Sequence, residues 1–262
     1  MFKLLNMRFI LFLFFVPINL IGQITRVDYN YYTKNTIDTT GINSYLLFDN
    51  EKSVYVFNSN TNKLEDQINE TPEFDIQIKR KIRDTLGFRV YNKYAHDTIY
   101  VIDKINIEKY AYKDDYVMQW IIINEYKKIE NYNCQLANLK FRGRDYTIWF
   151  TEEIPVPAGP WKFRGLPGLI LEVNDSANEV HFSLKSITFN QQIKSFFDYD
   201  FKNVEYISLN SFVKKRDDFG NELLKKTLSK LPRSANGSGK IISISSRMGL
   251  EKVYEWEEDE KD

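Results

Sequence analysis

Two arginines flank a glycine at Arg142-Gly143-Arg144. A guanidinium presents its N–H donors in one plane and can bind a carboxylate or a phosphate through two parallel hydrogen bonds. Two such groups beside a glycine turn could therefore grip an acidic small molecule or the carboxylate of a peptide. Alternatively, each arginine pairs with an Asp or Glu of the same chain, which contains 36 acidic residues. An exposed pair of that kind contributes little to stability.

Aromatic and basic residues that follow this turn could complete a binding site. If the arginines face a pocket lined by tryptophans, the ligand class that this chemistry implies is an acidic small molecule or a peptide carboxylate. The candidate ligand-binding residues are Arg142, Arg144, Trp149, Trp161 and Arg164.

Residue patterns typical of catalysis are few. Cys134 is the single cysteine, and the only histidines are His96 and His181. A nucleophilic cysteine needs a nearby base, whereas Cys134 lies in an alternating run that favours a small buried side chain. The histidines lack metal-ligand spacing, and the sequence has no P-loop, GxSxG or dinucleotide motif. We therefore predict no catalytic residue, no metal and no cofactor, although carboxylates that converge only in three dimensions stay compatible with a hydrolase.

The most constrained backbone lies at residues 159–170, GPWKFRGLPGLI, with three glycines and two prolines. Proline fixes its own φ, and glycine adopts conformations closed to other residues. Pro167 followed by Gly168 predicts a type II turn in which Gly168 has a positive φ. The residues to which we assign a structural role are Gly159, Pro160, Gly165, Leu166, Pro167, Gly168, Leu169, Ile170 and, upstream, Cys134.

Two bends in this motif bracket a short aromatic segment that contains Trp161 and Phe163. The motif is therefore interpreted as a chain reversal that packs both rings into the core. The alternative is a ligand site, because constrained loops on a rigid sheet often carry binding residues. The side chains of Lys162 and Arg164 distinguish the two, since a ligand site requires that they point into a cavity.

This motif, the run from Cys134 to Phe150 and the Ile154-Pro155 step together resemble the GLPGLI family of the Bacteroidetes cell envelope. The family is named after the hexapeptide at residues 165–170. The resemblance is dense from Val117 to Phe189 and thin elsewhere. That family has no established function, so no residue role is carried over. The resemblance implies an envelope protein associated with TonB-dependent uptake or outer-membrane maintenance.

The N-terminus predicts export from the cytoplasm. Basic residues precede an apolar run from Phe9 to Ile21, and Gly22 is followed by polar residues. This order is typical of a secretory signal peptide, and the run is too short to span a bilayer. No cysteine lies near the junction for lipid attachment. We expect residues 1–22 to be removed, leaving a secreted, most simply periplasmic, protein that is neither a lipoprotein nor an integral membrane protein.

Charge and cysteine content exclude two further classes of protein, those that bind nucleic acid through a basic surface and those held together by internal disulfides. Removal of residues 1–22, which hold two of the 36 basic residues, leaves 34 basic against 36 acidic side chains. Because the two charges nearly balance, the chain has no excess of basic residues of the kind that binds nucleic acid. A single cysteine excludes an internal disulfide, so the fold must depend on its apolar core. The 19 Phe, 17 Tyr and 4 Trp residues supply much of that core.

Hydrophobic periodicity favours strands over helices. Residues 45–57, 88–102 and 169–184 each read as two apolar runs joined by a polar turn, which predicts three β-hairpins. Further strands are expected at Cys134–Phe141 and Asp145–Phe150, on either side of the arginine turn. Short loops of this kind make neighbouring strands antiparallel.

Helical spacing is clear in one place, residues 219–231, where Pro232 ends the pattern. Residues 62–85 fit a strand and a helix equally well. We predict a mainly β (α+β) fold, with a single antiparallel, strongly curved sheet or open half-barrel and one or two packed helices. It forms one domain over residues 23–254, followed by a solvated acidic tail at 255–262.

A curved sheet with an aromatic concave face could hold an apolar or peptide ligand. We therefore expect a non-catalytic periplasmic carrier or accessory protein that binds a lipid or a peptide. One alternative is a hydrolase whose carboxylates converge in space. Another is a structural or assembly partner of an outer-membrane protein complex, which predicts a flat exposed aromatic patch instead of a cavity.

Overall fold

The computed structural model describes residues 24–33, 42–57, 88–191, 204–229 and 249–258. The predicted signal peptide and the ambiguous segment at residues 62–85 lie outside the described residues. The last four residues of the predicted acidic tail also lie outside them.

Alternating apolar and polar residues form strands with one buried face, and the described strands join in one sheet of twelve. Their bounds are β1 (Ile24–Thr33), β2 (Ile42–Phe48), β3 (Lys52–Phe57), β4 (Phe88–Lys93), β5 (Ile99–Ile105), β6 (Glu108–Asp114), β7 (Ile121–Ile129), β8 (Tyr132–Phe141), β9 (Arg144–Thr151), β10 (Leu169–Asp175), β11 (Val180–Gln191) and β12 (Glu205–Tyr206).

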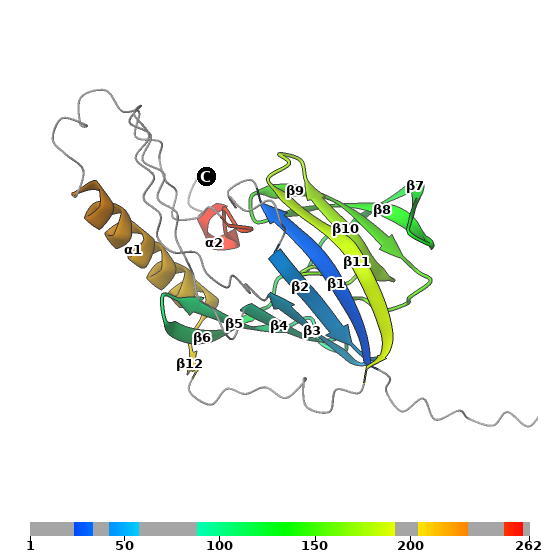
Figure 1. Cartoon of the computed structure of the whole chain (residues 1–262). Coiled ribbons are helices and arrows are strands. Elements are labelled where there is room, and N and C mark those ends of the chain that lie inside the picture. Colours follow the sequence, from blue (N-terminus) through cyan, green and yellow to red (C-terminus); the bar gives the residue numbers. More distant parts are fainter. Residues whose placement is uncertain (1–23, 34–41, 58–87, 192–203, 230–248, 259–262) are drawn as a thin grey trace, which may run out of the picture.

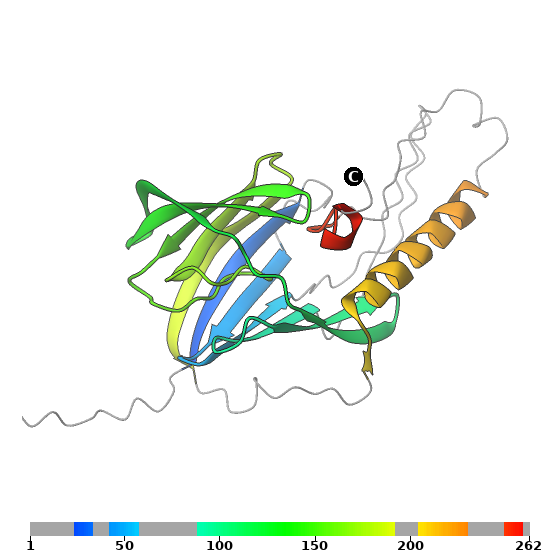
Figure 2. The same cartoon turned by 180° about the vertical axis from the view of Figure 1, so that it is seen from behind.

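Two antiparallel meanders make up this sheet. Strands β1 to β6 pair in chain order, and so do β7 to β11. The first strand, β1, joins the meanders by pairing with β11. Strands β12 and β7 stand at the two ends, and Figures 1 and 2 show a strongly curved sheet that does not close into a barrel.

The predicted hairpins are present as β2–β3, β4–β5 and β10–β11. The prediction of a single antiparallel sheet is wrong, because β12 pairs with β6 in parallel. Direction is dictated only where a short loop joins two neighbouring strands, and β12 is not joined to β6 by such a loop. The sheet is therefore mixed.

The prediction of helices packed over the sheet is also wrong. The first helix, α1 (Leu209–Leu228), lies beside β5 and β6 near one end of the sheet and does not cover its face. The helix begins at Leu209, ten residues before the predicted start at residue 219. The hydroxyl of Ser208, just before the helix, accepts a hydrogen bond from the Ser211 N–H at 3.1 Å and caps the N-terminus. The second helix, α2 (Glu255–Glu258), is a single turn on the inner side of the curved sheet.

The inner side of the sheet is filled by a core of aromatic and aliphatic side chains. Trp161 and Phe163 of the glycine-rich motif are both buried in it. The Phe163 ring meets the Trp161 ring at 5.2 Å and the Tyr146 ring at 4.9 Å, both edge to face. Phe212 brings the first turns of α1 into the same core, with its ring 4.7 Å from that of Tyr112.

The turn at Gly168 differs from its prediction. The described glycines with a positive φ are Gly143, at 76°, and Gly165, at 90°, and Gly168 is not among them. A Cβ on Gly168 would lie only 2.1 Å from the carbonyl oxygen of Thr151. Glycine is therefore required here for the close approach of two backbones at the start of the β9–β10 pairing, and not for the handedness of a turn.

Candidate functional site

The turn Phe141-Arg142-Gly143-Arg144 joins β8 to β9. Its two central residues both have positive φ, 45° at Arg142 and 76° at Gly143, as a type I′ hairpin turn requires. Although hairpin tips usually face water, Arg142 and Arg144 are both buried here. A segment from the end of the chain, residues 249–258, lies across this turn and covers it; we call it the C-terminal segment.

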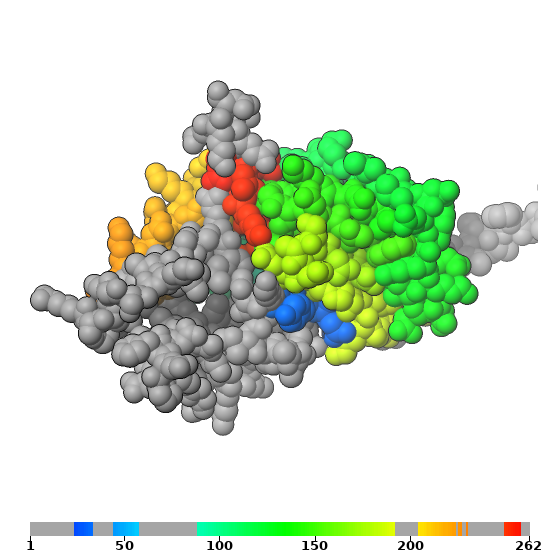
Figure 3. Space-filling model, turned by 90° about the horizontal axis from the view of Figure 1, so that it is seen from above, coloured from blue at the N-terminus to red at the C-terminus, as the bar shows by residue number. Residues whose placement is uncertain are grey.

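Figure 3 shows this arrangement from above, with the red atoms of the C-terminal segment directly against green atoms of the sheet and orange α1 on their other side. The backbone carbonyl of Arg142 accepts hydrogen bonds from the N–H groups of Lys252, at 2.9 Å, and Val253, at 3.3 Å. A Cβ on Gly143 would lie 3.1 Å from Val253 Cγ2. The turn is thus shaped for close contact with this segment.

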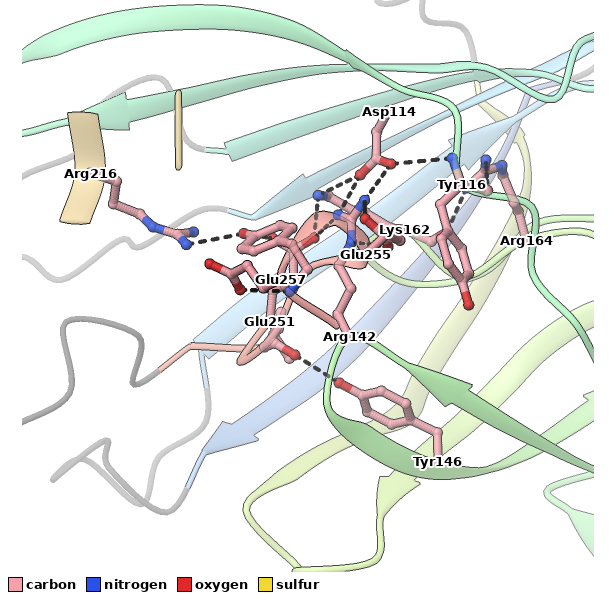
Figure 4. Close-up of polar contacts among 12 residues, drawn as sticks. Asp114, Tyr116, Arg142, Tyr146, Lys162, Arg164, Arg216, Glu251, Glu255 and Glu257 are labelled. Carbon is pink, nitrogen blue, oxygen red and sulfur yellow. Dashed lines mark hydrogen bonds and ion pairs between the residues drawn. The ribbon is translucent and has the colours of Figure 1, made fainter. Parts of the chain in front are cut away.

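Five charged side chains meet beneath it and form what we call the charge cluster (Figure 4). Arg142 binds both oxygens of Asp114, from Nη1 at 2.7 Å and from Nη2 at 2.8 Å. Lys162 donates from Nζ to Asp114 at 2.9 Å and to Glu251 at 2.6 Å. Arg142 also binds Glu251 through Nη1, and Glu255 from Nε at 2.9 Å. The cluster therefore joins β6, the arginine turn, the glycine-rich motif and the C-terminal segment.

The two buried carboxylates of the cluster, those of Asp114 and Glu251, are held in the charged form. Burial alone would raise the pKa of Asp114, but Lys162 and Arg142 outweigh burial and hold that pKa well below its ordinary value. The same balance of burial against Lys162 and Arg142 lowers the pKa of Glu251. Neither group can therefore serve as a proton donor near neutral pH.

Tyr254 anchors the C-terminal segment beside the cluster. Its buried hydroxyl donates to Glu251 Oε2 at 3.0 Å and accepts from Arg216 Nη2 of α1 at 3.0 Å. The Arg142 guanidinium carbon lies 4.9 Å from the centre of the Tyr254 ring, and the Trp256 ring stacks on Tyr254 at 4.8 Å. The first residues of the predicted solvated tail are thus ordered, which corrects that expectation for Glu255–Glu258.

Arg144 supports the same segment from the other side of the turn. Its Nη1 binds Asp175 and, at 2.9 Å, Glu179, and its Nη2 donates to the carbonyl of Gly249 at 2.9 Å. Glu179 in turn pairs with Lys252 at 2.8 Å. Arg142 and Arg144, two of the three arginines predicted to bind a ligand, therefore bind carboxylates of the chain itself. Their pairs with Asp114, Glu251 and Asp175 are buried, whereas the Glu179 and Glu255 side chains are 30% and 41% exposed.

The other predicted ligand-binding residues do not join the arginine turn in one pocket. Trp161 is in the core. Trp149 is on the opposite face of β9, with Lys127 Nζ 4.5 Å from its ring centre. Arg164 donates to the backbone carbonyls of Asp97, at 2.6 Å, and Tyr116, at 2.7 Å. Trp161 and Arg164 both line one small cavity, whose lining does not include Arg142, Arg144 or Trp149.

A small cavity does adjoin the motif. Its volume is about 10 Å³, which is room for roughly one water molecule. Trp161, Lys162 and Arg164 line it together with Tyr55, whose hydroxyl is buried without a hydrogen-bond partner. Lys162 nevertheless points to the charge cluster, and its side chain is 1% exposed. It thus faces neither a ligand-sized cavity nor solvent.

Neither catalytic arrangement considered for the sequence is assembled in the described residues. Cys134 on β8 and His181 on β11 are three strands apart, which corresponds to about 14 Å at the usual spacing. Burial raises the pKa of the Cys134 thiol to about 11. Asp114 and Glu251 do converge, but Arg142 and Lys162 bridge them without space for a substrate.

Asp103 on β5 shows how strongly burial acts on this inner face. Burial raises its pKa to about 6, against the hydrogen bond from the Lys104 N–H and the charges of Lys162 and Arg216, while Glu251 raises the pKa further. An unfolded Asp has a pKa of about 3.9. The folded protein therefore binds this proton more tightly, and the stability that protonation contributes is lost as pH rises through 6.

We therefore expect Asp103→Asn to raise the free energy of unfolding at pH 7.5 by about 2 kcal/mol, because asparagine never ionises. At pH 4 the gain should nearly vanish. Urea denaturation at both pH values measures the difference, with Asp115→Asn, an exposed site nearby, as the control. A gain of equal size at both pH values would contradict the pKa shift.

Comparison with known proteins adds a family and a fold. Residues 141–172 match a family model whose description is "Protein of unknown function (Porph_ging)". This is a Bacteroidetes-type family. The matched residues include Arg142, Arg144 and Lys162 but stop before the C-terminal segment. No curated protein matches the chain.

Two solved structures of PNGF-II resemble this fold. In one crystal form, space group P21, the TM-score is 0.55 at 13% identity, and the likeness covers 74% of this chain and 33% of the other. In a second form, space group C2, the TM-score is 0.52 at 16% identity, with 74% and 32% coverage. The chain thus spans about a third of the length of these proteins, and the likeness concerns the fold alone.

Two further findings concern only the residues that the structure describes. Among them, no group of three or more His, Cys, Asp or Glu side chains is arranged to hold a metal ion. No described helix is both long and apolar enough to cross a bilayer.

No sequence pattern indicated the acidic half of the charge cluster. Asp114, Glu251 and Glu255 lie 28, 109 and 113 positions from Arg142, in segments without a recognisable motif. Lys162 was open to interpretation, since it stands between two aromatic residues that a chain reversal would bury. A lysine in such a place needs a buried carboxylate partner, and this reasoning could have identified it as part of an ion-pair network.

Proposed function

We propose that this protein is a non-catalytic accessory protein of the cell envelope that binds a polypeptide partner through an apolar patch at the β7 end of its sheet. The observation that carries the proposal is the exposure of this strand. Its residues Ile121, Ile122 and Tyr126 are 63%, 48% and 64% exposed, and Val117 just before it is 53% exposed. Ile121 and Ile122 are consecutive and point to opposite faces of the strand, so both faces of β7 expose a large apolar side chain. We call these exposed side chains the β7 patch, and exposed large apolar side chains commonly mark an interaction site.

The form of β7 indicates how a partner would bind. Among the described strands, β7 pairs only with β8, so its other edge faces outward. The register shifts between Ile123 and Tyr126, which is an irregularity that discourages further strand pairing. Contact through apolar side chains therefore fits this surface better than extension of the sheet by another strand.

The interior favours this proposal over a carrier of lipids or peptides. Pockets for small ligands usually measure about 300 Å³ or more, whereas the cavity beside the glycine-rich motif measures about 10 Å³. Aromatic and aliphatic side chains of the described residues pack into one buried core. A surface-bound polypeptide is thus the ligand class that we propose.

Photo-crosslinking in the native host tests the patch. Tyr126→p-benzoylphenylalanine should give an adduct with a defined partner protein, and Ile121→Lys in the same chain should abolish it. Tyr206 is the matched control, because it is 54% exposed on β12 at the opposite end of the sheet. Equal adducts from positions 126 and 206, no adduct from 126, or an adduct only with a second copy of this chain would contradict the proposal.

We also propose membership of the GLPGLI family and export by the N-terminal signal peptide. The match of residues 141–172 to a Bacteroidetes-type family supports the first, and the order of charged, apolar and small residues supports the second. Fractionation followed by N-terminal sequencing tests export, with a mature protein that begins at Gln23 in the periplasm as the expected result. An intact N-terminus would contradict it.

A further inference from the structure

We propose that the arginine turn and Lys162 form a recognition site for an acidic, aromatic peptide, and that the C-terminal segment is its tethered ligand. The site is separate from the β7 patch and does not depend on the function proposed for that patch. The segment would accordingly be exchangeable with the same peptide supplied by another molecule.

The described residues outside the C-terminal segment, which we call the body of the protein, supply a preformed receptor. The type I′ turn holds the Arg142 guanidinium in place, and Asp114 binds it through two oxygens and fixes its plane. The Nε edge of the guanidinium is not used by Asp114. It points to the C-terminal segment and donates a hydrogen bond to Glu255. Such a fixed donor edge is how arginines recognise carboxylates in peptide-binding sites.

The segment contacts the body in the manner of a bound peptide. It is not a strand of the sheet, and its backbone is held by three residues: the carbonyl of Arg142 accepts from it, while Arg144 and the Tyr146 hydroxyl, at 3.1 Å, donate to it. Its buried anchors are Glu251 and Tyr254. A few buried anchors with a polar rim are typical of peptide recognition.

Charge explains why an acidic occupant is needed. Within the charge cluster, the residues outside the C-terminal segment are Arg142 and Lys162, with two positive charges, and Asp114, with one negative charge, so one positive charge is in excess there. Glu251 of the segment brings this sum to zero, and Glu255, whose side chain is 41% exposed, adds a negative charge at the rim. A buried cation without a partner is strongly unfavourable, so an empty receptor would attract a carboxylate.

The family match covers the basic half of the site. Residues 141–172 contain Arg142, Gly143, Arg144 and Lys162, whereas Asp114, Glu251 and Tyr254 lie outside the match. The cations that would bind an acidic peptide therefore lie in the part of the chain that a known family model describes.

Full-length Glu251→Gln protein and a labelled peptide of residues 249–262 test the proposal. The variant weakens the tethered ligand, so the peptide should bind to it in fluorescence anisotropy and raise its melting temperature. A peptide that itself carries the Glu251→Gln change should bind about 100-fold more weakly, because it lacks the buried carboxylate. A peptide of scrambled order should not bind.

Glu257→Gln is the matched control, with the same change of charge in the same segment. Glu257 accepts a hydrogen bond from the N–H of Tyr254 within the segment at 2.9 Å. Its tethered ligand stays in place, so the peptide should bind this variant at least about 100-fold more weakly than Glu251→Gln, since tethering gives a high effective concentration.

Glu255→Gln is the second variant, in case Glu251→Gln protein does not fold. The pair of Glu255 with Arg142 is half-exposed, so we expect this variant to bind the peptide less tightly than Glu251→Gln protein does. The ranking of affinities should be the same, with the unchanged peptide above the Glu251→Gln peptide and the scrambled peptide last. Peptide binding to neither variant, equal binding to Glu257→Gln, or equal binding of the scrambled peptide would overturn the proposal. None of these outcomes bears on the β7 patch.

Discussion

Arg142→Met is expected to lower the free energy of unfolding by about 3–5 kcal/mol, because it leaves buried carboxylates without their partner. Asp114, Glu251 and Glu255 all bind this one guanidinium. Lys162 alone cannot neutralise Asp114 and Glu251, which lie with it in a site closed to water. Urea denaturation monitored by tryptophan fluorescence, with linear extrapolation to water, measures the loss.

Arg26→Met is the matched control for that change. Arg26 binds Asp28 at 2.6 Å, but the two side chains are 36% and 24% exposed. Removing this pair should lower the free energy of unfolding by no more than about 1 kcal/mol. If Arg142→Met destabilises the protein as little as Arg26→Met does, the charge cluster does not hold the C-terminal segment.

Gly168→Ala is expected to lower the free energy of unfolding by about 3 kcal/mol or more. The added Cβ would lie 2.1 Å from the carbonyl oxygen and 2.5 Å from the carbonyl carbon of Thr151. A backbone group cannot move aside as the end of a flexible side chain can, so β9 and β10 must separate where their pairing begins. Urea denaturation again measures the loss.

Gly249→Ala provides the control for added volume. An added Cβ at Gly249 meets no atom within 4 Å, so the change should alter the free energy of unfolding by less than about 0.5 kcal/mol. A similar loss in both variants would show that the effect of Gly168→Ala comes from glycine replacement in general and not from the contact with Thr151.

Local patterns predicted some of the strands that short loops join. The hairpin at residues 45–57 has alternating aromatic and β-branched residues with a polar turn, and it is present as β2–β3. The central strand β1 was missed, although Val27, Tyr29 and Tyr31 alternate and are buried. Its pairing with β11 could not be predicted, because periodicity indicates a strand and not which distant strand it pairs with.

For the motif at residues 159–170, the sequence predicted the burial of its aromatic rings but not the reason why position 168 must be glycine. Prolines and glycines predicted a chain reversal that packs Trp161 and Phe163, and both rings are buried. The reason for Gly168 was not predictable, because it lies in the distance to Thr151, seventeen positions earlier. Whether a position has room for a Cβ depends on which atoms the fold places beside it.

By itself, the sequence determined a β-rich chain, the position of the arginine turn and the two kinds of partner that its guanidiniums could have. Those properties follow from residue type and from spacing over a few positions. Only the tertiary structure decided that the partners of Arg142 are Asp114, Glu251 and Glu255, and that the pairs with Asp114 and Glu251 are buried. The physical reason is that ion pairing depends on distance and burial, which are set when β6, the turn and the C-terminal segment meet across more than a hundred residues of chain.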